Sequence, residues 1–182
     1  YASELHNWWS GIETRVAQTA DVVKNLPENS YDETLSMLLK ITADDPDSQD
    51  IYMAFGNTGK FLDGSGWVPD DTFVFTDRAW YKGALEKKGA IYTSDPYVDA
   101  STGKTCLACA VMVKDNVVLS SDIVFDKVSE KMGDFKSSAE GVNYYIINKD
   151  TKDILVSSNA DVVGQNLSDS TDPIMKGFAG II

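Results

Sequence analysis

Apolar side chains recur every three or four residues along the first 26 positions, and this spacing predicts a long helix with one apolar face. Pro27 ends that helix because proline lacks an N–H donor. A second helix is predicted from Tyr31, with Ser30 or Asp32 as its cap. We therefore expect residues 1–45 to form a helical scaffold. The apolar face of the first helix comprises Leu5, Trp8, Trp9, Ile12, Val16, Thr19, Val22, Val23 and Leu26.

After the acidic residues 44–50 the periodicity changes. Apolar positions now alternate or run together, which predicts strands. A short helix over residues 78–88 interrupts the strands, capped by Asp77 and ended by Gly89. These elements define a first module, residues 46–125. Its predicted strands cover residues 51–55, 60–63, 73–75, 90–93, 104–114 and 117–125.

A second module is predicted in residues 126–182, beginning with a helix over 126–138. Strands over 142–148 and 154–158 follow, joined by a turn, and they repeat the strand, turn, strand order of residues 51–63. The predicted fold class is α+β, with antiparallel sheets that carry helices on one face. We expect the second module to be incomplete, since residues 172–180 bring no further strand to its sheet.

Composition limits the partners that the chain can bind. The 182 residues are 43% hydrophobic, enough for a core, and carry a net charge of −12, which disfavours nucleic acid and anionic lipid. The longest apolar run covers residues 106–113, whereas a membrane span needs about 20 residues. We expect a segment of a longer protein, because the chain opens on Tyr1 and closes on an apolar run.

The cysteine and histidine content narrows the chemistry. Cys106 and Cys109 have the CxxC spacing of redox sites, but a strand would place them on opposite faces. Packed, unbonded thiols are therefore favoured, with a redox or metal role as the alternative. His6 is the single histidine, which excludes a histidine-based metal site or a Ser-His triad within the chain. No metal or other cofactor is predicted.

Arg78 begins the short helix, where free N–H groups and the helix dipole favour an anion, and its guanidinium can bind a carboxylate at two points. Trp80 and Tyr81 follow and could enclose a small polar ligand between flat walls. The alternative is that Arg78 pairs with Asp77 or another acid and that both aromatic side chains belong to the core.

Three further residues suggest the other end of a ligand site. Tyr97 and Asp99 lie two apart in an extended segment, so they face the same way. Asp122 interrupts an apolar strand, and a buried carboxylate needs a cation or a hydrogen-bond donor. A ligand ammonium could serve Asp122, as could Tyr97 or nearby backbone, and Asp99 could simply begin a turn. A cation at one end and carboxylates at the other fit a zwitterion such as a free amino acid.

Several motifs occur together across nearly the whole chain: Gly66-Trp67, the run 78–81 (Arg-Ala-Trp-Tyr), the run 96–99 (Pro-Tyr-Val-Asp), Thr102-Gly103 and the run 121–123 (Ser-Asp-Ile). In this combination the chain resembles the double Cache family, the extracytoplasmic sensor domains of bacterial chemoreceptors, histidine kinases and diguanylate cyclases. The resemblance implies two PAS-like modules on the long helix, with the ligand in the first.

The resemblance also implies roles for individual residues. Arg78 and Trp80 would hold an amino-acid carboxylate, and the ammonium would be held by Tyr81, Tyr97, Asp99 and Asp122. The family's tyrosine five residues before the arginine is replaced here by Phe73, which has no hydroxyl, and Ala79 replaces a proline. Phe73 therefore puts the ligand class in question more than the fold.

The expected function is sensing of a small molecule, most simply an amino acid, by a transmembrane receptor of bacteria. The chain would be a non-catalytic domain outside the cytoplasm, dimeric through its long helix, and attached to the membrane by flanking helices. The ligand could instead be an amine, a carboxylate or a nucleobase. The same residues could also belong to a structural ectodomain without a ligand, or to an enzyme that uses Asp99 and Asp122 as paired carboxylates.

Overall fold

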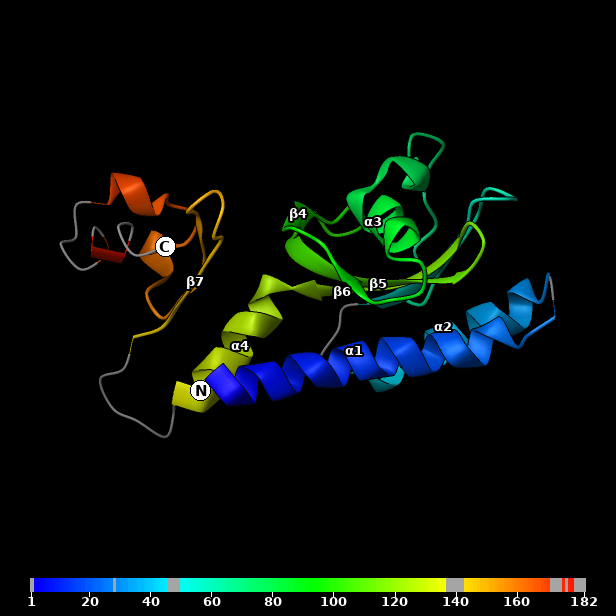
Figure 1. Cartoon of the computed structure of the whole chain (residues 1–182), viewed down its shortest axis with the longest axis horizontal. Helices are drawn as coiled ribbons and strands as arrows, with labels where there is room; N and C mark the ends of the chain where they lie inside the picture. Colours follow the sequence, from blue (N-terminus) through cyan, green and yellow to red (C-terminus); the bar gives the residue numbers. More distant parts are fainter. Residues whose placement is uncertain are drawn as a thin grey trace. The chain divides into compact units, whose positions relative to one another are not determined.

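The computed structural model describes residues 2–27, 29–45, 50–136 and 143–170, together with residues 175, 177 and 178. Two compact units make up the chain, Ala2–Val124 and Phe125–Ile182 (Figure 1). None of the described helices is both long enough and apolar enough to span a membrane.

Two helices open the first unit, α1 (Ala2–Lys24) and α2 (Tyr31–Asp44). The predicted apolar face of α1 is confirmed for the buried side chains, which follow steps of three and four residues: Ile12, Val16, Thr19, Ala20 and Val23. The prediction is wrong for Val22, which is 54% exposed, because it points about 100° away from its buried neighbour Val23. Leu38 is the fully buried residue of α2. The cap prediction for α2 is wrong in part: Ser30 occupies the cap position, but its side chain makes no cap hydrogen bond because its backbone is not extended there.

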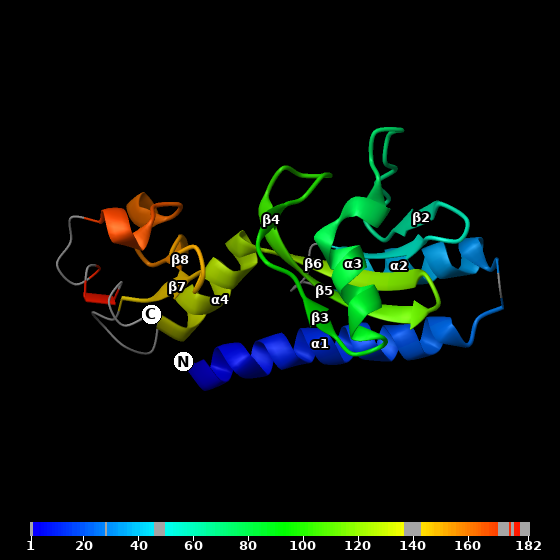
Figure 2. The ribbon, with the colours of Figure 1, turned by 45° about the horizontal axis from the view of Figure 1, so that its top comes forward.

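A six-stranded antiparallel sheet forms the centre of this unit and confirms the α+β class. Its order is β2 (Lys60–Asp63), β1 (Asp50–Phe55), β6 (Val117–Val124), β5 (Thr105–Lys114) and β3 (Tyr92–Thr93), and β4 (Tyr97–Val98) also pairs with β5. The long strands β5 and β6 lie side by side in Figure 2. The register sets Asp50 opposite Asp122 and Tyr52 opposite Ser120.

The two faces of the sheet are covered by different helices, α1 and α2 on one side and α3 (Ala79–Lys87) on the other (Figure 1). Small side chains on β5 allow α3 to approach, since Ala108 and Ala110 are completely buried beneath it. The core on this face is mainly aromatic and comprises Tyr52, Ala54, Phe75, Trp80, Tyr81, Ala84, Ala108, Ala110 and Val118.

The segment before α3 differs from its prediction. Residues 73–75 form no strand; Phe75–Asp77 is a 3-10 turn (η1). The alternation of apolar residues there reflects packing, because the rings of Phe73 and Phe75 lie 5.3 and 6.0 Å from that of Phe61. Asp77 does not cap α3 either. Arg78 holds the cap position, and the Asp77 carboxylate lies 3.6 Å from Lys82 Nζ at the surface.

The cysteine prediction is confirmed: both thiols are free and buried on β5. Cys106 Sγ lies 3.7 Å from Asp122 Oδ2 on the face that carries α3. Cys109 is on the opposite face, where the carboxylate of Glu13 on α1 adds to the effect of burial and the pKa of the thiol is raised to about 12. The strand geometry therefore separates the two sulfur atoms.

The second unit contains α4 (Phe125–Lys136) and an antiparallel hairpin of β7 (Tyr145–Ile147) and β8 (Ile154–Ser157). Two 3-10 turns follow, η2 (Ala160–Val162) and η3 (Leu167–Asp169). The hairpin confirms the predicted repeat of strand, turn and strand. Its core contains Ile154, Leu167 and Met175. Parts of the predicted helix 126–138, strand 142–148 and segment 172–180 lie outside the described residues.

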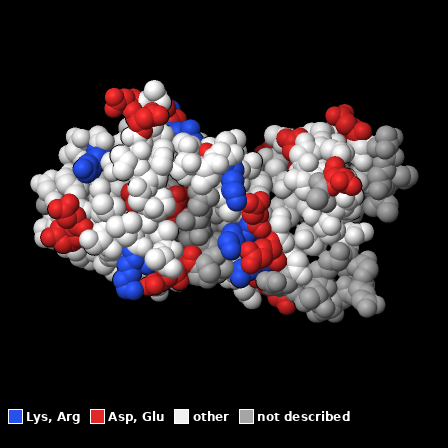
Figure 3. Space-filling view, turned by 180° about the vertical axis from the view of Figure 1, so that it is seen from behind, with Lys and Arg blue, Asp and Glu red and all other residues white. Residues whose placement is uncertain are grey.

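Charged side chains are interspersed over the surface. On the face seen in Figure 3, groups of Asp and Glu alternate with Lys and Arg over the described residues. A broad basic surface of the kind that nucleic acid requires is not seen on that part of the molecule.

Gly64 permits the close approach of α2 to the sheet. A Cβ atom there would lie 2.6 Å from the Leu38 carbonyl and 2.7 Å from that of Ile51. We expect Gly64→Ala to lower the free energy of unfolding by about 1–3 kcal/mol, because backbone must move to relieve the overlap. Urea denaturation measures the change.

The matched control is Gly11→Ala in α1, where an added Cβ meets no atom within 4 Å. This change should raise the free energy of unfolding by about 0.5–1 kcal/mol, since alanine is the better helix former. Equal effects of the two substitutions would contradict the close contact at Gly64.

Candidate functional site

A narrow cavity lies on the face of the sheet that carries α3, where β1 begins. Its volume is about 20 Å³, which is room for one water molecule. A second, more open pocket of about 380 Å³ shares Arg78, Trp80 and Tyr97 with it. The narrow cavity is lined by Asp50, Tyr52, Phe61, Asp63, Trp67, Phe73, Arg78, Trp80, Tyr97, Asp99, Ala100 and Asp122.

The structure brings six of the seven predicted site residues to this cavity: Phe73, Arg78, Trp80, Tyr97, Asp99 and Asp122. The seventh, Tyr81, is not among its lining residues. Successive residues of a helix point about 100° apart, so Tyr81 turns away from Trp80. Its hydroxyl donates to the carbonyl of Asn116 at 2.9 Å, and its ring packs against Phe75.

Asp122 is the buried centre of the site, with 3% of its surface exposed. Its Oδ1 accepts hydrogen bonds from the hydroxyls of Tyr52 at 2.7 Å and Tyr97 at 2.5 Å. Burial raises the pKa of the Asp122 carboxyl to about 6, although the two tyrosine donors oppose the change. Burial and the Asp122 charge raise the pKa of both tyrosines, so these hydroxyls stay protonated as donors.

Asp50 lies directly opposite Asp122 in the sheet and is equally buried, with 2% of its surface exposed. Burial, together with the charges of Asp122, Asp63 and Asp99, raises the pKa of the Asp50 carboxyl well above its usual range. The proximity of these groups was not predicted from the sequence.

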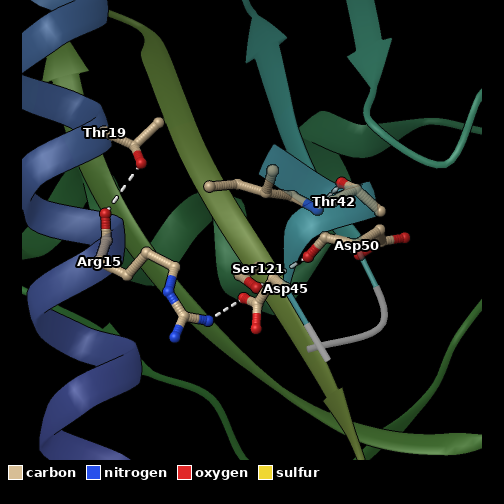
Figure 4. A network of polar contacts seen from close by, with 7 residues as sticks. Arg15, Thr19, Thr42, Asp45, Asp50 and Ser121 are labelled. Carbon is tan, nitrogen blue, oxygen red and sulfur yellow. Dashed lines mark hydrogen bonds and ion pairs between the residues drawn. The ribbon is translucent and has the colours of Figure 1, made fainter. Parts of the chain in front are cut away.

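The backbone around Asp50 is hydrogen-bonded to β6 and to α2, as Figure 4 shows. Ser121 Oγ donates to the Asp50 carbonyl at 2.7 Å, and the next backbone N–H of the strand donates to Thr42 Oγ1 of α2 at 3.2 Å. An ion pair joins Arg15 of α1 to Asp45 at the end of α2. The start of β1 is therefore bonded to α2, and α2 in turn to α1.

The other two aspartates of the cavity are held by their own turns. Asp63 Oδ1 accepts from the N–H and hydroxyl of Ser65, at 2.7 and 2.6 Å. Asp99 accepts from the N–H groups of Ser101 and Thr102, at 3.1 and 2.8 Å. Asp99 thus begins a turn, as one interpretation of the sequence had it, and it also lines the cavity.

Arg78 lies at the mouth of the cavity. Its Nη2 donates to the Val98 carbonyl at 3.1 Å, and its guanidinium lies 5.9 Å from the ring of Phe73 and 5.5 Å from that of Tyr97. Among the described residues, no carboxylate is within ion-pair distance of Arg78. The guanidinium therefore keeps donors available for an anion.

Sequence reasoning missed six residues of the cavity: Asp50, Tyr52, Phe61, Asp63, Trp67 and Ala100. Tyr52 could have been found from alternation along β1, but only the register shows that Asp50 faces Asp122. Trp67 reaches the site from the loop after β2, where its ring packs edge-on against Phe73 at 5.0 Å. The described residues include no group of three or more His, Cys, Asp or Glu placed to hold a metal ion.

The pKa of Asp122 predicts a dependence of stability on pH. Because its value rises from 3.8 to about 6 on folding, folding favours the protonated form, and this stabilisation is lost as the pH rises through about 6. Relative to wild type, Asp122→Asn should therefore become more stable between pH 4 and pH 7, by up to roughly 3 kcal/mol. Urea denaturation at both pH values measures the difference.

Asp115→Asn is the control, since this carboxylate is exposed in the turn between β5 and β6. It controls for the loss of one negative charge from the chain. A difference between Asp122→Asn and wild type that does not change with pH would refute the raised pKa.

Comparison with known proteins gives a consistent result. No family model matches the sequence. The methyl-accepting chemotaxis protein McpB of Bacillus subtilis (strain 168) is 40% identical over 65 residues, which are 35% of this chain and 10% of that protein. The chain thus matches about a tenth of the length of this curated relative.

Solved structures match over almost the whole chain. The ligand-binding domain of Pseudomonas aeruginosa PAO1 chemoreceptor PctC, in complex with GABA, has a TM-score of 0.77 at 20% identity and covers 93% of this chain and 77% of its own. The ligand-binding domain of Campylobacter jejuni chemoreceptor Tlp3, in complex with 4-methylisoleucine, has a TM-score of 0.76 at 17% identity. The match covers 97% of this chain and 72% of that domain. The ligand-binding domain of Pseudomonas fluorescens chemoreceptor CtaA, in complex with L-valine, has a TM-score of 0.72 at 25% identity. The match covers 91% of this chain and 74% of that domain. The chain therefore has the fold of the ligand-binding domains of bacterial chemoreceptors, in keeping with its resemblance to the double Cache family.

Proposed function

We propose that this chain is the ligand-sensing domain of a bacterial transmembrane receptor and that it binds a free amino acid between Arg78 and Asp122. One observation carries the proposal: a buried carboxyl group, held by two tyrosine hydroxyls, and an arginine with available donors line the same cavity. Groups of opposite charge that line one cavity match the two charges of a zwitterion.

Each end of an amino acid finds suitable chemistry in this arrangement. The Arg78 guanidinium would bind the carboxylate at two points, as planar Arg–carboxylate pairs do. The ammonium would be bound by Asp122 and the Tyr97 hydroxyl, with Asp99 beside them. Trp80 and Phe73 would enclose the apolar atoms. Phe73 offers no hydroxyl, so the carboxylate has one hydrogen bond fewer than the family's tyrosine would give.

A ligand of this size needs more room than the narrow cavity of about 20 Å³ provides. The adjoining pocket of about 380 Å³ shares Arg78, Trp80 and Tyr97 with it. Release of Arg78 from the Val98 carbonyl would join the two spaces, and the freed guanidinium would then turn to the ligand carboxylate. Binding would thus exchange one acceptor of Arg78 for a better one.

The comparisons support an amino-acid ligand and a place outside the cytoplasm. Three of the matched chemoreceptor domains were solved with L-valine, GABA or 4-methylisoleucine bound, and sensor domains of this kind act by binding rather than by catalysis.

Residues 46–125 would be the ligand-binding module, residues 1–45 its helical scaffold and residues 126–182 the partial second module. Flanking helices would cross the membrane, and α1 would form the contact of a homodimer.

Signalling would follow from a shift between two arrangements of the helices, of which the ligand favours one. Asp50 and Tyr52 of β1 reach the cavity, and the same strand is hydrogen-bonded to α2 through Thr42. Movement of β1 on ligand binding would therefore reach the scaffold directly.

A ligand-free ectodomain is the second candidate, favoured by the small volume of the cavity. It differs from the first candidate in one respect: no amino acid would stabilise it.

The proposal predicts stabilisation by amino acids. At 100 times its dissociation constant a ligand adds about 2.7 kcal/mol to the free energy of unfolding, which raises Tm by roughly 5–10 °C for a chain of this size. A thermal-shift screen of the common amino acids, with amines, carboxylates and nucleobases as parallel sets, measures the effect. Arg78→Ala and Asp122→Asn should each abolish it.

Lys82→Ala and Asp115→Asn are the matched controls, since both side chains are exposed and outside the cavity. They should keep the full rise in Tm. If no amino acid raises Tm in wild type while the protein is folded, the amino-acid proposal fails; if the amines, carboxylates and nucleobases are also without effect, the ligand-free candidate takes its place.

The two tyrosines predicted for the ammonium side should respond differently. Tyr97→Phe removes a donor that lies 2.5 Å from Asp122, so we expect affinity to fall by about tenfold, the value of one hydrogen bond to a charged group. Tyr81→Phe should leave affinity unchanged and lower the free energy of unfolding by about 1 kcal/mol, since its partner is the Asn116 carbonyl. Isothermal titration calorimetry and urea denaturation test both, and a large loss of affinity in Tyr81→Phe would contradict the placement.

A further inference from the structure

The cavity contains acceptor capacity that an ordinary amino acid would not use. Four aspartates line it, against a single cationic side chain, Arg78. Asp63 and Asp99 are satisfied by their own turns, and Asp122 Oδ1 is satisfied by two tyrosines. Asp50 differs, because its buried Oδ1 has no hydrogen-bond partner among the described residues. A buried acceptor of this kind calls for a donor that comes from elsewhere.

The register places this acceptor beside the ammonium end of the site. Asp50 and Asp122 are cross-strand partners, so their side chains share one face of the sheet with Cβ atoms about 4.5–5.5 Å apart. Like charges in that position repel each other. A single ammonium would leave one of the two carboxylates uncompensated, whereas two cationic groups joined by a short spacer would neutralise both.

We infer that the preferred ligand carries a second cationic group, which Asp50 binds: an amino acid whose side chain ends in an amine on a short aliphatic spacer. This inference rests on the proposed function and extends it. Arg78 holds the carboxylate, Asp122 the α-ammonium, and Asp50 the side-chain ammonium, whose three N–H groups supply the donor that Oδ1 lacks. Asp50 is thus the residue that sets specificity.

The charges around Asp50 add a consequence for binding. Asp122 faces it from β6, Asp63 from β2, Asp99 from the turn after β4, and burial raises the pKa of Asp50, Asp122 and Asp63. A cationic ligand lowers these values again, so binding releases protons and becomes tighter as the pH rises from 5 to 7. The affinity for norvaline, which has no second cationic group, should rise less between pH 5 and pH 7.

Calorimetric titration of matched ligands tests the inference: L-ornithine against L-norvaline, and L-lysine against L-norleucine. For wild type we expect the amine-bearing member of each pair to bind roughly 10- to 100-fold more tightly, as for a hydrogen bond between charged groups. In Asp50→Asn the preference should fall to within about threefold. Asp115→Asn, the control, should keep the full preference.

Each possible result identifies what has failed. Equal binding of the paired ligands by wild type overturns the role of Asp50 but leaves the proposed function in place. Binding of none of the four overturns the role of Asp50, and the thermal-shift screen of the common amino acids then decides whether the proposed function fails as well. 1,4-Diaminobutane resembles ornithine without its carboxylate. If it binds as tightly as ornithine, Arg78 does not bind the ligand carboxylate. Should Asp50→Asn fail to fold, the wild-type ligand pairs and proton release, measured in buffers of different ionisation enthalpy, still decide the question.

Discussion

A carboxyl group buried between two tyrosine hydroxyls is the constraint on which this structure depends. Removing such a group from water costs several kcal/mol unless donors meet it. The donors for Asp122 come from β1 and β4, strands separated from each other by β6 and β5. Their hydroxyls meet only if the sheet has this register, and alanines on β5 leave room for Trp80 above them. The site therefore exists only in the folded sheet with this strand order.

Local pattern was enough to predict the helices, the long strands and half of the residues that line the cavity. The apolar face of α1 has a clear period, and Asp122 is conspicuous because it interrupts an apolar strand. Asp50 could not be found in the same way: it looks like the end of an acidic loop until the register sets it opposite Asp122. Tyr81 does not line the cavity although it follows Trp80 directly, because adjacent residues of a helix point about 100° apart. Residues 73–75 alternate like a strand but owe their pattern to packing on Phe61.

The sheet separates two tasks between its faces. Tyr52 reaches the cavity, whereas Met53, its neighbour on β1, is buried on the side of the helices. Ser121 and Asp122 are likewise adjacent on β6, one bonded to the Asp50 carbonyl and the other to tyrosines. Because β1 and β6 contact the cavity on one face and the helices on the other, a movement of either strand changes both sets of contacts. The ion pair between Arg15 and Asp45 joins α1 to the end of α2.

The same separation gives the chain two internal chemical reporters. Cys106 lies beside Asp122, Cys109 lies towards α1, and burial keeps both thiols protonated and therefore poor nucleophiles. An alkylating reagent reaches either sulfur only when the layer above it opens. The labelling rate of Cys106 would thus record opening of the layer around Asp122, and that of Cys109 separation of the scaffold helix from the sheet, without any introduced probe.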